Sequence, residues 1–286
     1  MSDVQDNTPA YVITGASGML GRAWRQLLEA EQLSYIAYDR LQFDITDTEA
    51  VEAKVPQGVH AVINCAAYTD VDGAETHEDA AMRINADGVA RLAERCFVIA
   101  ATLVNYSTDY VFAGDASEPY PIDAPIAPAG AYGQSKAAGE QAILDAGCHH
   151  RNIRTSWLYA PWGNNFVRTM LRLTDERDTL SVVDDQRGRP TSAQHLAAVS
   201  KKLLLGAPDG TYHVADGGEC TWFEFTKEIA RQAGHACEIQ PCTTDQFPRP
   251  AKRPAYSVLD LSRTEAAVGQ MPAWQANLAE VLKQIG

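Results

Sequence analysis

Short apolar segments alternate with longer, helix-like segments along most of this chain. Residues 10–30 read as a strand, a glycine-rich turn and a helix, and the alternation continues to about residue 218. This pattern is typical of βαβ units, which build a parallel sheet covered by helices. The other expected strands lie within 34–39, 60–68, 102–112, 150–159, 179–185 and 210–218, and the expected helices lie within 48–55, 80–100, 164–177 and 193–206.

The C-terminal part departs from this alternation. Helix-like stretches at 221–234 and 276–286 flank a Pro-rich loop at 247–254. We therefore expect the α/β fold class, with a Rossmann-type doubly wound parallel sheet and a smaller C-terminal substrate-binding lobe. The predicted sheet domain comprises residues 9–155 and 187–215, and the predicted lobe comprises residues 156–186 and 216–286.

Composition narrows the possible partners. The 286 residues are 45% hydrophobic, which is enough for a large core, and the formal net charge is -13 with no Lys/Arg-rich run. Such an acidic chain lacks the positive surface that nucleic acid requires, so we expect no nucleic-acid partner. The first ten residues are polar and no apolar run could span a bilayer, which predicts a cytoplasmic protein without membrane association.

Cysteine and histidine give no support for a metal site. The six cysteines occur without a C-x-x-C pair, and the seven histidines are not clustered. We expect reduced structural thiols and no bound metal.

The first glycine-rich turn predicts a dinucleotide site. Gly15, Gly18 and Gly21 have G-x-x-G-x-x-G spacing after a strand and before a helix, with Met19 and Leu20 between them. Backbone amides at such a helix N-terminus would face a pyrophosphate. An ordinary tight turn between strand and helix is the alternative.

The end of the next strand concerns the choice of cofactor. Asp39 lies where a carboxylate accepts hydrogen bonds from the adenosine ribose, which favours NADH. Arg40 follows directly and could pair with a 2'-phosphate, so NADPH stays open. Asp44 and Ile45 could line the adenine pocket, although a helix N-cap at Asp44 or Thr46 is the alternative.

Later strand ends supply groups that could meet the cofactor and substrate. Ala66 and Ala67 are small enough for close approach, and Thr108 supplies a hydroxyl that could equally be bonded to backbone. Tyr132 and Lys136 are four residues apart in a helix-favouring segment, so they share one helix face. By themselves they could be a surface tyrosine packed on a lysine stem.

Taken together, these features resemble the extended short-chain dehydrogenases/reductases. Longer motifs are similar to those of the dTDP-4-dehydrorhamnose reductase family and cover nearly the whole chain. They are CAAYTDVDGAE, YSTDYVFAG, PAGAYGQSKAAGEQA, RTSWLYAPWGNNFVRTMLRL, VVDDQRGRPTSAQHLA, GTYHVADGGECTWFEF and RPAYSVLDLSR. TSWLY and DQRGRPT are much more specific than the glycine and Tyr/Lys patterns.

The resemblance implies hydride transfer from NADPH or NADH to the 4-keto carbon of dTDP-4-dehydro-L-rhamnose, giving dTDP-L-rhamnose. Tyr132 would donate the proton, and Lys136 would favour the phenolate and hold the nicotinamide ribose. Thr108 would hydrogen-bond the sugar carbonyl.

The resemblance also implies further contacts. Ala67, Tyr68 and Thr69 would touch cofactor and substrate, and Asp109 and Trp157 would touch the substrate. Packing between the lobes is the alternative for Trp157. A divalent ion is associated with part of the family through acidic residues on the first helix, but Ala23 and its neighbours supply none, so no metal is expected. A homodimer is compatible with the family and specified by no pattern here.

Two other functions stay open at this point. One is a nucleotide-sugar epimerase or dehydratase on the same scaffold, although STDYVF resembles the reductases more closely. The other is a non-catalytic regulatory subunit resembling that of methionine adenosyltransferase, which the presence of Tyr132, Lys136 and Thr108 weakens.

Overall fold

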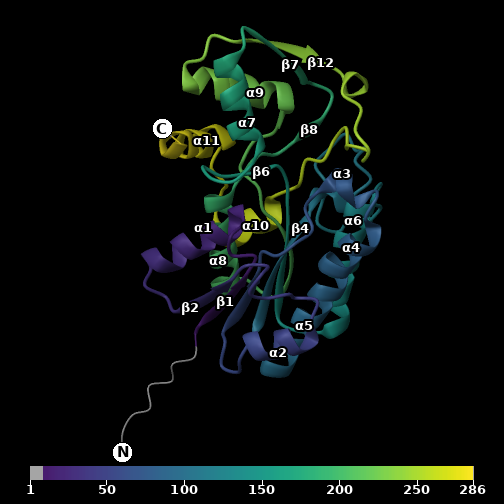
Figure 1. Ribbon diagram of the computed structural model, residues 1–286, viewed down its shortest axis with the longest axis vertical. Helices are drawn as coiled ribbons and strands as arrows, with labels where there is room; N and C mark the ends of the chain where they lie inside the picture. Colours follow the sequence, from purple (N-terminus) through teal and green to yellow (C-terminus); the bar gives the residue numbers. More distant parts are fainter. Residues whose placement is uncertain (1–8, 286) are drawn as a thin grey trace, which may run out of the picture.

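A six-stranded, wholly parallel sheet forms the centre of the protein. The structure is a computed structural model and describes residues 9–285. The strand order is β10-β5-β4-β3-β1-β2, which confirms the expected doubly wound α/β sheet (Figure 1). The strands are β1 (Tyr11–Thr14), β2 (Tyr35–Tyr38), β3 (Ala61–Asn64), β4 (Thr102–Thr108), β5 (His150–Thr155) and β10 (Gly210–His213).

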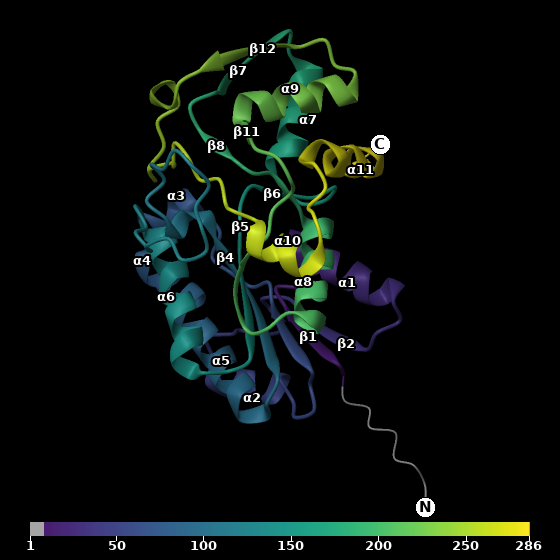
Figure 2. The ribbon, with the colours of Figure 1, turned by 180° about the vertical axis from the view of Figure 1, so that it is seen from behind.

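Helices cover both faces of this sheet. One face packs against α1 (Met19–Ala30) and α8 (Ala193–Gly206), and the opposite face packs against α2 (Thr48–Lys54), α5 (Gly88–Ile99) and α6 (Ala131–Ala146) (Figure 2). The strand order reverses between β1 and β3, since β2 is added on one side of β1 and β3, β4, β5 and β10 follow on the other. In such sheets ligands bind at this point, outside the carboxyl ends of the strands.

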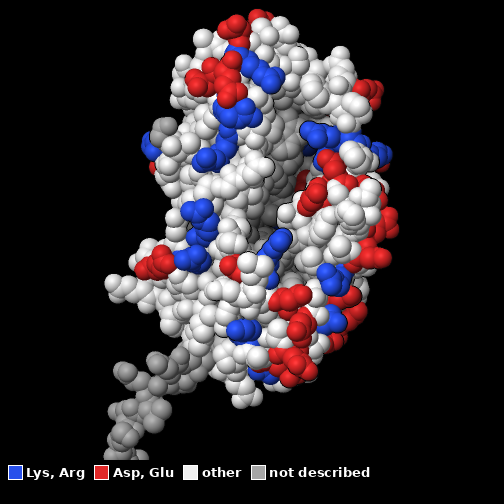
Figure 3. Space-filling view, viewed as in Figure 1, with Lys and Arg blue, Asp and Glu red and all other residues white. Residues whose placement is uncertain are grey.

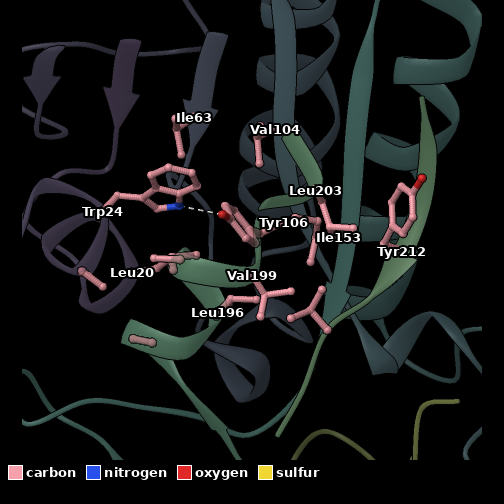
Figure 4. Close-up of a cluster of buried hydrophobic side chains, with 14 of the residues drawn as sticks. Leu20, Trp24, Ile63, Val104, Tyr106, Ile153, Leu196, Val199, Leu203 and Tyr212 are labelled. Atoms are coloured by element: carbon pink, nitrogen blue, oxygen red, sulfur yellow. Dashed lines mark hydrogen bonds between the residues drawn. The ribbon is translucent and has the colours of Figure 1, made fainter. Parts of the chain in front are cut away.

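The core beneath α1 and α8 is built from large apolar side chains. The Trp24 indole N–H donates a 2.6 Å hydrogen bond to the hydroxyl of Tyr106, so both polar atoms are satisfied inside the core (Figure 4). The other labelled members of this cluster are Leu20, Ile63, Val104, Ile153, Leu196, Val199, Leu203 and Tyr212.

A buried polar ladder crosses four neighbouring strands. The Thr14 hydroxyl donates to the Asn64 side chain at 2.7 Å, and the Asn64 amide donates to Asn105 at 2.9 Å. The Asn105 amide then donates to Asn152 at 3.0 Å. Each pair stands directly opposite in the strand register, so the ladder specifies which residues face one another across the sheet.

Above the sheet, a second core contains α7 (Phe166–Glu176), α9 (Trp222–Ala233) and α11 (Trp274–Ile285). Two strands beside them, β7 (Thr179–Val183) and β12 (Glu238–Cys242), pair in parallel. Residues 216–286 therefore contain the three helices α9, α10 (Ser262–Val268) and α11, together with β12, where two helices and a loop were expected. The unexpected helix, α10, packs against α8 and β10, so part of 216–286 returns to the sheet. The division into two domains stays a prediction.

Several shorter elements also differ from the expectation. The helix expected at 80–100 is divided into α4 (Glu78–Met82), a π-helical turn at Arg83–Asp87 and α5. The strand expected at 150–159 stops at Thr155, because Trp157 has a left-handed φ of 47°. The remaining elements are α3 (Val71–Ala74), β6 (Leu158–Tyr159) paired with β9 (Thr191–Ser192), β8 (Arg187–Gly188) paired with β11 (Cys220–Thr221), and 3-10 turns at Asp109–Val111 and Thr244–Gln246.

Across the described residues, no helix combines the length and apolar character needed to span a membrane. The polar start of the chain lies outside this range, apart from residues 9 and 10.

We expect Asn105→Ala to lower the free energy of unfolding more than Asn152→Ala. The first change strands polar atoms of both Asn64 and Asn152, while the second strands only one amide of Asn105. Each stranded buried group costs about 1–3 kcal/mol, so the difference should be about 1–3 kcal/mol. Urea unfolding of both variants measures it, and equal losses would show that the ladder does not stabilise the sheet.

Candidate active site

The glycine-rich turn after β1 meets the turn after β3. Gly15 has a left-handed φ of 63°, and a Cβ there would lie 2.6 Å from the backbone of Cys65 and Ala66. A Cβ at Gly21 would lie 2.4 Å from the carbonyl oxygen of Gly15. Only glycine therefore permits this packing at either position.

The same turn leaves amides available to an anion. Gly18 is the N-cap of α1 and makes no side-chain capping bond. Within residues 9–285, no acceptor meets the backbone N–H groups of Met19, Leu20 and Gly21. These amides at a helix N-terminus fit a pyrophosphate, so the predicted dinucleotide site has a structural basis.

The structure places Asp39 and Arg40 directly after β2, beside this turn. The N–H of Ala16 donates to the carbonyl of Tyr38 at 3.0 Å, which ties the two segments together. Asp39 Oδ1 already accepts the amides of Leu41 and Gln42, while Arg40 is exposed. A ribose would therefore meet the remaining oxygen of Asp39.

Asp44 and Ile45 lie in the loop before α2. The Asp44 carboxylate accepts from the amide and hydroxyl of Thr46, and these bonds lower its pKa. The N-cap of α2 is Asp47, so the alternative of an N-cap at Asp44 or Thr46 is wrong. Ile45 is buried in the core beside Gly88, which leaves mainly its backbone for any ligand.

The loop after β3 carries Ala66, Ala67, Tyr68 and Thr69 and is held by Asn85. Asn85 accepts from the Tyr68 amide at 2.9 Å and donates to the Tyr68 carbonyl at 3.0 Å. Its amide also donates to the Ser135 hydroxyl of α6 at 3.0 Å. Asn85 therefore joins the loop after β3 to α6, the helix that carries Tyr132 and Lys136.

Asn85 was missed from the sequence. It lies in the π-helical turn, which rotates a polar residue into the interior of an otherwise regular helix pattern. A buried asparagine in an apolar helix face was the available signal.

Close contacts position α6, the helix with Tyr132 and Lys136. A Cβ at Gly139 would lie 2.1 Å from the carbonyl oxygen of Asn85, so this glycine lets the two backbones touch. The first amide of the helix, at Ala131, donates to the Glu75 carboxylate at 3.0 Å. Glu75 thus caps a helix whose own N-cap residue is glycine.

Tyr132 and Thr108 meet at the end of β4. Removal from water raises the pKa of Tyr132 to about 12, and the Asp109 carboxylate adds to this rise, while a hydrogen bond with Thr108 opposes it. The Tyr110 ring packs edge-on against Tyr132, with 5.7 Å between centroids. In the chain alone the phenol is therefore less acidic than free tyrosine, opposite to the direction implied by the family resemblance.

Lys136 is buried one turn further along α6. Burial lowers its pKa to about 8, and the Glu140 carboxylate, one turn beyond, opposes this fall. Among the described residues no hydrogen bond supports the ammonium. Such a buried, unpaired cation fits a ligand hydroxyl, as predicted for the nicotinamide ribose.

A buried ion pair fixes Glu140, the carboxylate one turn beyond Lys136 on α6. Arg154 of β5 donates to both Glu140 oxygens, with a shortest distance of 2.7 Å. The guanidinium also donates to the carbonyl of Ile122 and lies 5.0 Å from the centre of the Phe112 ring. Glu140 therefore stays beside Lys136 without neutralising it directly.

Asp109 follows Thr108 and is also buried. Its Oδ1 accepts from the Thr108 hydroxyl at 3.0 Å. Oδ2 has no partner of good hydrogen-bond geometry in the described chain, although the Ser257 hydroxyl lies close enough to lower the pKa of Asp109 against the effect of burial. Burial raises the pKa of Asp109 to about 6. An acceptor with a free oxygen beside Thr108 fits the predicted contact with a sugar hydroxyl.

Trp157 packs against the second core, beside α9. Its ring stacks on Trp222 with centroids 3.5 Å apart, and a Cβ at Gly188 would lie 2.6 Å from it. The packing alternative thus describes one face of this ring. A substrate contact through the remaining surface stays a prediction.

Metal ligands do not gather around this edge of the sheet. No group of three or more His, Cys, Asp or Glu side chains in residues 9–285 is arranged to hold an ion, and the first turn of α1 carries no acidic residue.

A family model described as the RmlD substrate binding domain matches residues 10–286. The chain belongs to this family. It is similar to the RmlD relative dTDP-4-dehydrorhamnose reductase of Streptomyces griseus, with 43% identity over 95% of this chain and 92% of that protein. The family resemblance drawn from the sequence motifs is thereby confirmed.

Two further similarities bear on ligands. A Bacillus anthracis dTDP-4-dehydrorhamnose reductase solved in complex with NADP is 39% identical, has a TM-score of 0.92 and is matched over 97% of this chain and 99% of that chain. A probable dTDP-4,6-dihydroxy-2-methyloxan-3-one 4-ketoreductase of Streptomyces antibioticus is 40% identical over 96% of this chain and 95% of that protein. Within the RmlD family, the roles of individual residues in this chain stay predictions.

We expect Lys136→Met to stabilise the cofactor-free protein at pH 7 by on the order of 1–3 kcal/mol, because it removes a buried charge. Its pKa is lowered on folding, from 10.5 to about 8, so between these values the unfolded state binds more protons. Parent stability should therefore rise with pH in this window relative to the variant. Urea unfolding at pH 7 and pH 10 measures both effects.

The exposed Lys283→Met is the matched control and should show neither effect. The rise in melting temperature that NADPH causes should shrink in Lys136→Met alone. A less stable cofactor-free Lys136→Met protein would contradict the assignment of Lys136 as an unsatisfied charge.

Proposed function

We propose that the protein is an NAD(P)H-dependent reductase that converts dTDP-4-dehydro-L-rhamnose into dTDP-L-rhamnose. The proposal rests on one observation above all, namely that Tyr132 meets Thr108 at the end of β4, with the unpaired Lys136 ammonium one turn further along α6. β4 ends at the same edge of the parallel sheet as β1, which leads into the glycine-rich turn. Relatives that align over nearly the whole chain carry reductase names, which supports the same reaction class.

The chain's own groups can bind the cofactor in two places. The free amides of Met19, Leu20 and Gly21 would hold the pyrophosphate, and Lys136 would hold a ribose hydroxyl. When bound, the nicotinamide supplies the hydride for the reduction. The NADP complex of the similar Bacillus anthracis enzyme supports this assignment.

Tyr132 is suited to act as the proton donor. With its pKa raised to about 12, the phenol keeps its proton at neutral pH until negative charge develops on the substrate oxygen. The Thr108 hydroxyl, which now donates to Asp109, would turn to donate to that oxygen. Lys136 adds positive charge below the phenol and stabilises the phenolate that remains.

A related dTDP-4-keto sugar is a second candidate substrate. The similar Streptomyces antibioticus protein bears the name of a probable 4-ketoreductase acting on a different dTDP-linked sugar. The chemistry at Tyr132 would be the same for either sugar, since both carry the keto group at the same carbon.

Turnover distinguishes these possibilities and the two other classes. The purified protein should oxidise NADPH when the rhamnose precursor is added, and the product should be dTDP-L-rhamnose by mass and retention time. Faster reduction of another dTDP-4-keto sugar would identify that sugar as the preferred substrate. Binding without oxidation of NADPH would favour a regulatory subunit, and product without net oxidation would favour an epimerase or dehydratase.

A cytoplasmic location and a homodimer also stay predictions, the second testable by size-exclusion chromatography.

We expect Tyr132→Phe to lower kcat by about two to four powers of ten, because it deletes the proton donor alone. NADPH affinity should change little, since the ring and Lys136 remain. Stopped-flow turnover and fluorescence titration measure the two quantities. Near-normal turnover in a folded variant would refute the role of Tyr132.

We expect both NADPH and NADH to support turnover. Asp39→Asn keeps the acceptor for Leu41 and Gln42 but removes the charge that repels a 2'-phosphate, so it should shift preference toward NADPH. Arg40→Ala should shift preference toward NADH. Each effect is about 1 kcal/mol at this exposed site, or less than tenfold in the ratio of kcat/KM values. An unchanged ratio in both variants would exclude these residues from the ribose site.

A further inference from the structure

A Pro-rich segment crosses from the lobe to the sheet domain beside the active site. This segment, residues 247–254, is called the strap below; it leaves the lobe after β12 and reaches α3 (Figure 2). The Ala251 amide donates to Asp72 Oδ1 at 3.2 Å, and Arg253 pairs with Asp72 Oδ2 at 2.9 Å. Pro254 packs on Gly114, where a Cβ would lie 2.5 Å away. The strap is therefore fixed to the sheet domain through its C-terminal half, residues 251–254.

The strap is positive in an otherwise acidic protein. Arg249, Lys252 and Arg253 fall within five residues, whereas the whole chain has a net charge of -13. Arg249 and Arg253 share Asp72 as an anchor, with Arg249 3.9 Å from it and 63% exposed. Lys and Arg side chains lie along this margin of the hollow between the lobe and the sheet domain (Figure 3). One carboxylate leaves this cluster with excess positive charge.

Arg253 also lies close to the catalytic side chains. Burial raises the pKa of Tyr110, the Asp109 carboxylate adds to this, and the nearby Arg253 guanidinium opposes it. Tyr110 in turn packs against Tyr132 at 5.7 Å between ring centroids. Nη1 of Arg253 is buried and has no hydrogen-bond partner in the described chain. A guanidinium with an unused donor thus stands one aromatic ring away from the proton donor.

We infer that the strap binds the diphosphate of the sugar nucleotide, with Arg253 as the principal contact. The inference rests on the proposed function, because a sugar held at Tyr132 and Thr108 carries its diphosphate as the next group. A forked guanidinium matches phosphate oxygens, and a new acceptor would satisfy Nη1. Asp72 orients Arg253 in the free protein, and Arg249 adds charge at the rim.

A simpler role for Arg253 is a latch that only ties the strap to α3. The two roles differ in what happens when the anchor loses its charge. A latch is weakened equally by loss of either partner, whereas a ligand contact needs the guanidinium and tolerates a neutral anchor. Asp72→Asn removes the charge and keeps one oxygen acceptor, for either Ala251 or Arg253, so it weakens the anchor without removing the guanidinium and therefore separates the two roles.

The test is calorimetric titration of dTDP and of thymidine into the parent protein and its variants, in the presence of NADP. We expect Arg253→Gln to weaken dTDP binding about 10–100-fold, the loss of one charged hydrogen-bond contact, and to leave thymidine binding unchanged. Asp72→Asn should weaken dTDP binding less than threefold. Arg231→Gln, an exposed pair with Glu228 on α9, is the control and should have no effect.

Turnover gives a second measure. Arg253→Gln should raise KM for the sugar nucleotide by a similar factor with kcat changed only a few-fold, and Arg253→Lys should recover part of the loss. Arg249→Gln, at an exposed position that cannot disturb folding, should weaken dTDP binding about two- to fivefold. The melting-temperature rise caused by NADPH shows that each variant is folded.

Equal losses in Arg253→Gln and Asp72→Asn would make the pair a latch and overturn the inference. Unchanged dTDP binding in both Arg253→Gln and Arg249→Gln would overturn it as well, even if the parent turns over normally. A parent protein that binds dTDP with the expected losses in its variants, yet reduces no dTDP-4-keto sugar, would refute the proposed function alone. A parent protein that binds no dTDP would overturn both.

Discussion

The polar ladder from Thr14 through Asn64 and Asn105 to Asn152 is the constraint on which the site depends. Buried amides need partners, and the bonds between these four side chains form only when their strands stand in one register, although Nδ2 of Asn152, at the end of the ladder, has no partner in the described chain. A shift by one residue would turn every amide to the other face of the sheet. Correct pairing brings the ends of β1, β3 and β4 to one edge, and the glycine turn, the Ala66 loop and Thr108 are attached there.

Around that edge, the protein maintains several polar groups that its own residues do not satisfy. The Lys136 ammonium, Oδ2 of Asp109 and Nη1 of Arg253 are all buried or nearly so and lack partners in the described chain. Each of them costs stability in the free protein. Apolar packing elsewhere offsets that cost, including the core around the satisfied Trp24–Tyr106 pair. The open groups are therefore best understood as contacts reserved for ligands.

Strands β1 and β3 were predictable from the sequence because they are buried on both faces and read as mainly apolar runs, whereas the more polar β5 was predictable from its place in the alternation of strands and helices. The placement of Tyr132 and Lys136 on one helix face followed from spacing alone. Asn85 and the strap were not predictable in this way, since they act through contacts between segments distant in the chain. The pairing of β12 with β7 escaped notice because three of its five residues are Glu238, Gln240 and Pro241. The capping residue Asp47 was missed because Asp44 matched the same local rule.

Burial acts on Tyr132 and Lys136 in opposite directions, and the combination suits reduction. The same dry surroundings raise the pKa of the phenol to about 12 and lower that of the ammonium to about 8. The phenol therefore retains its proton, while the ammonium is charged at neutral pH but readily loses its proton in more alkaline solution. Glu140 opposes that loss from one turn away, and Arg154 keeps Glu140 in place. The Arg154–Glu140 pair thus influences the charge of Lys136, one turn along α6 from Tyr132, so the electrostatics at the end of β4 depend on packing that reaches across α6 to β5.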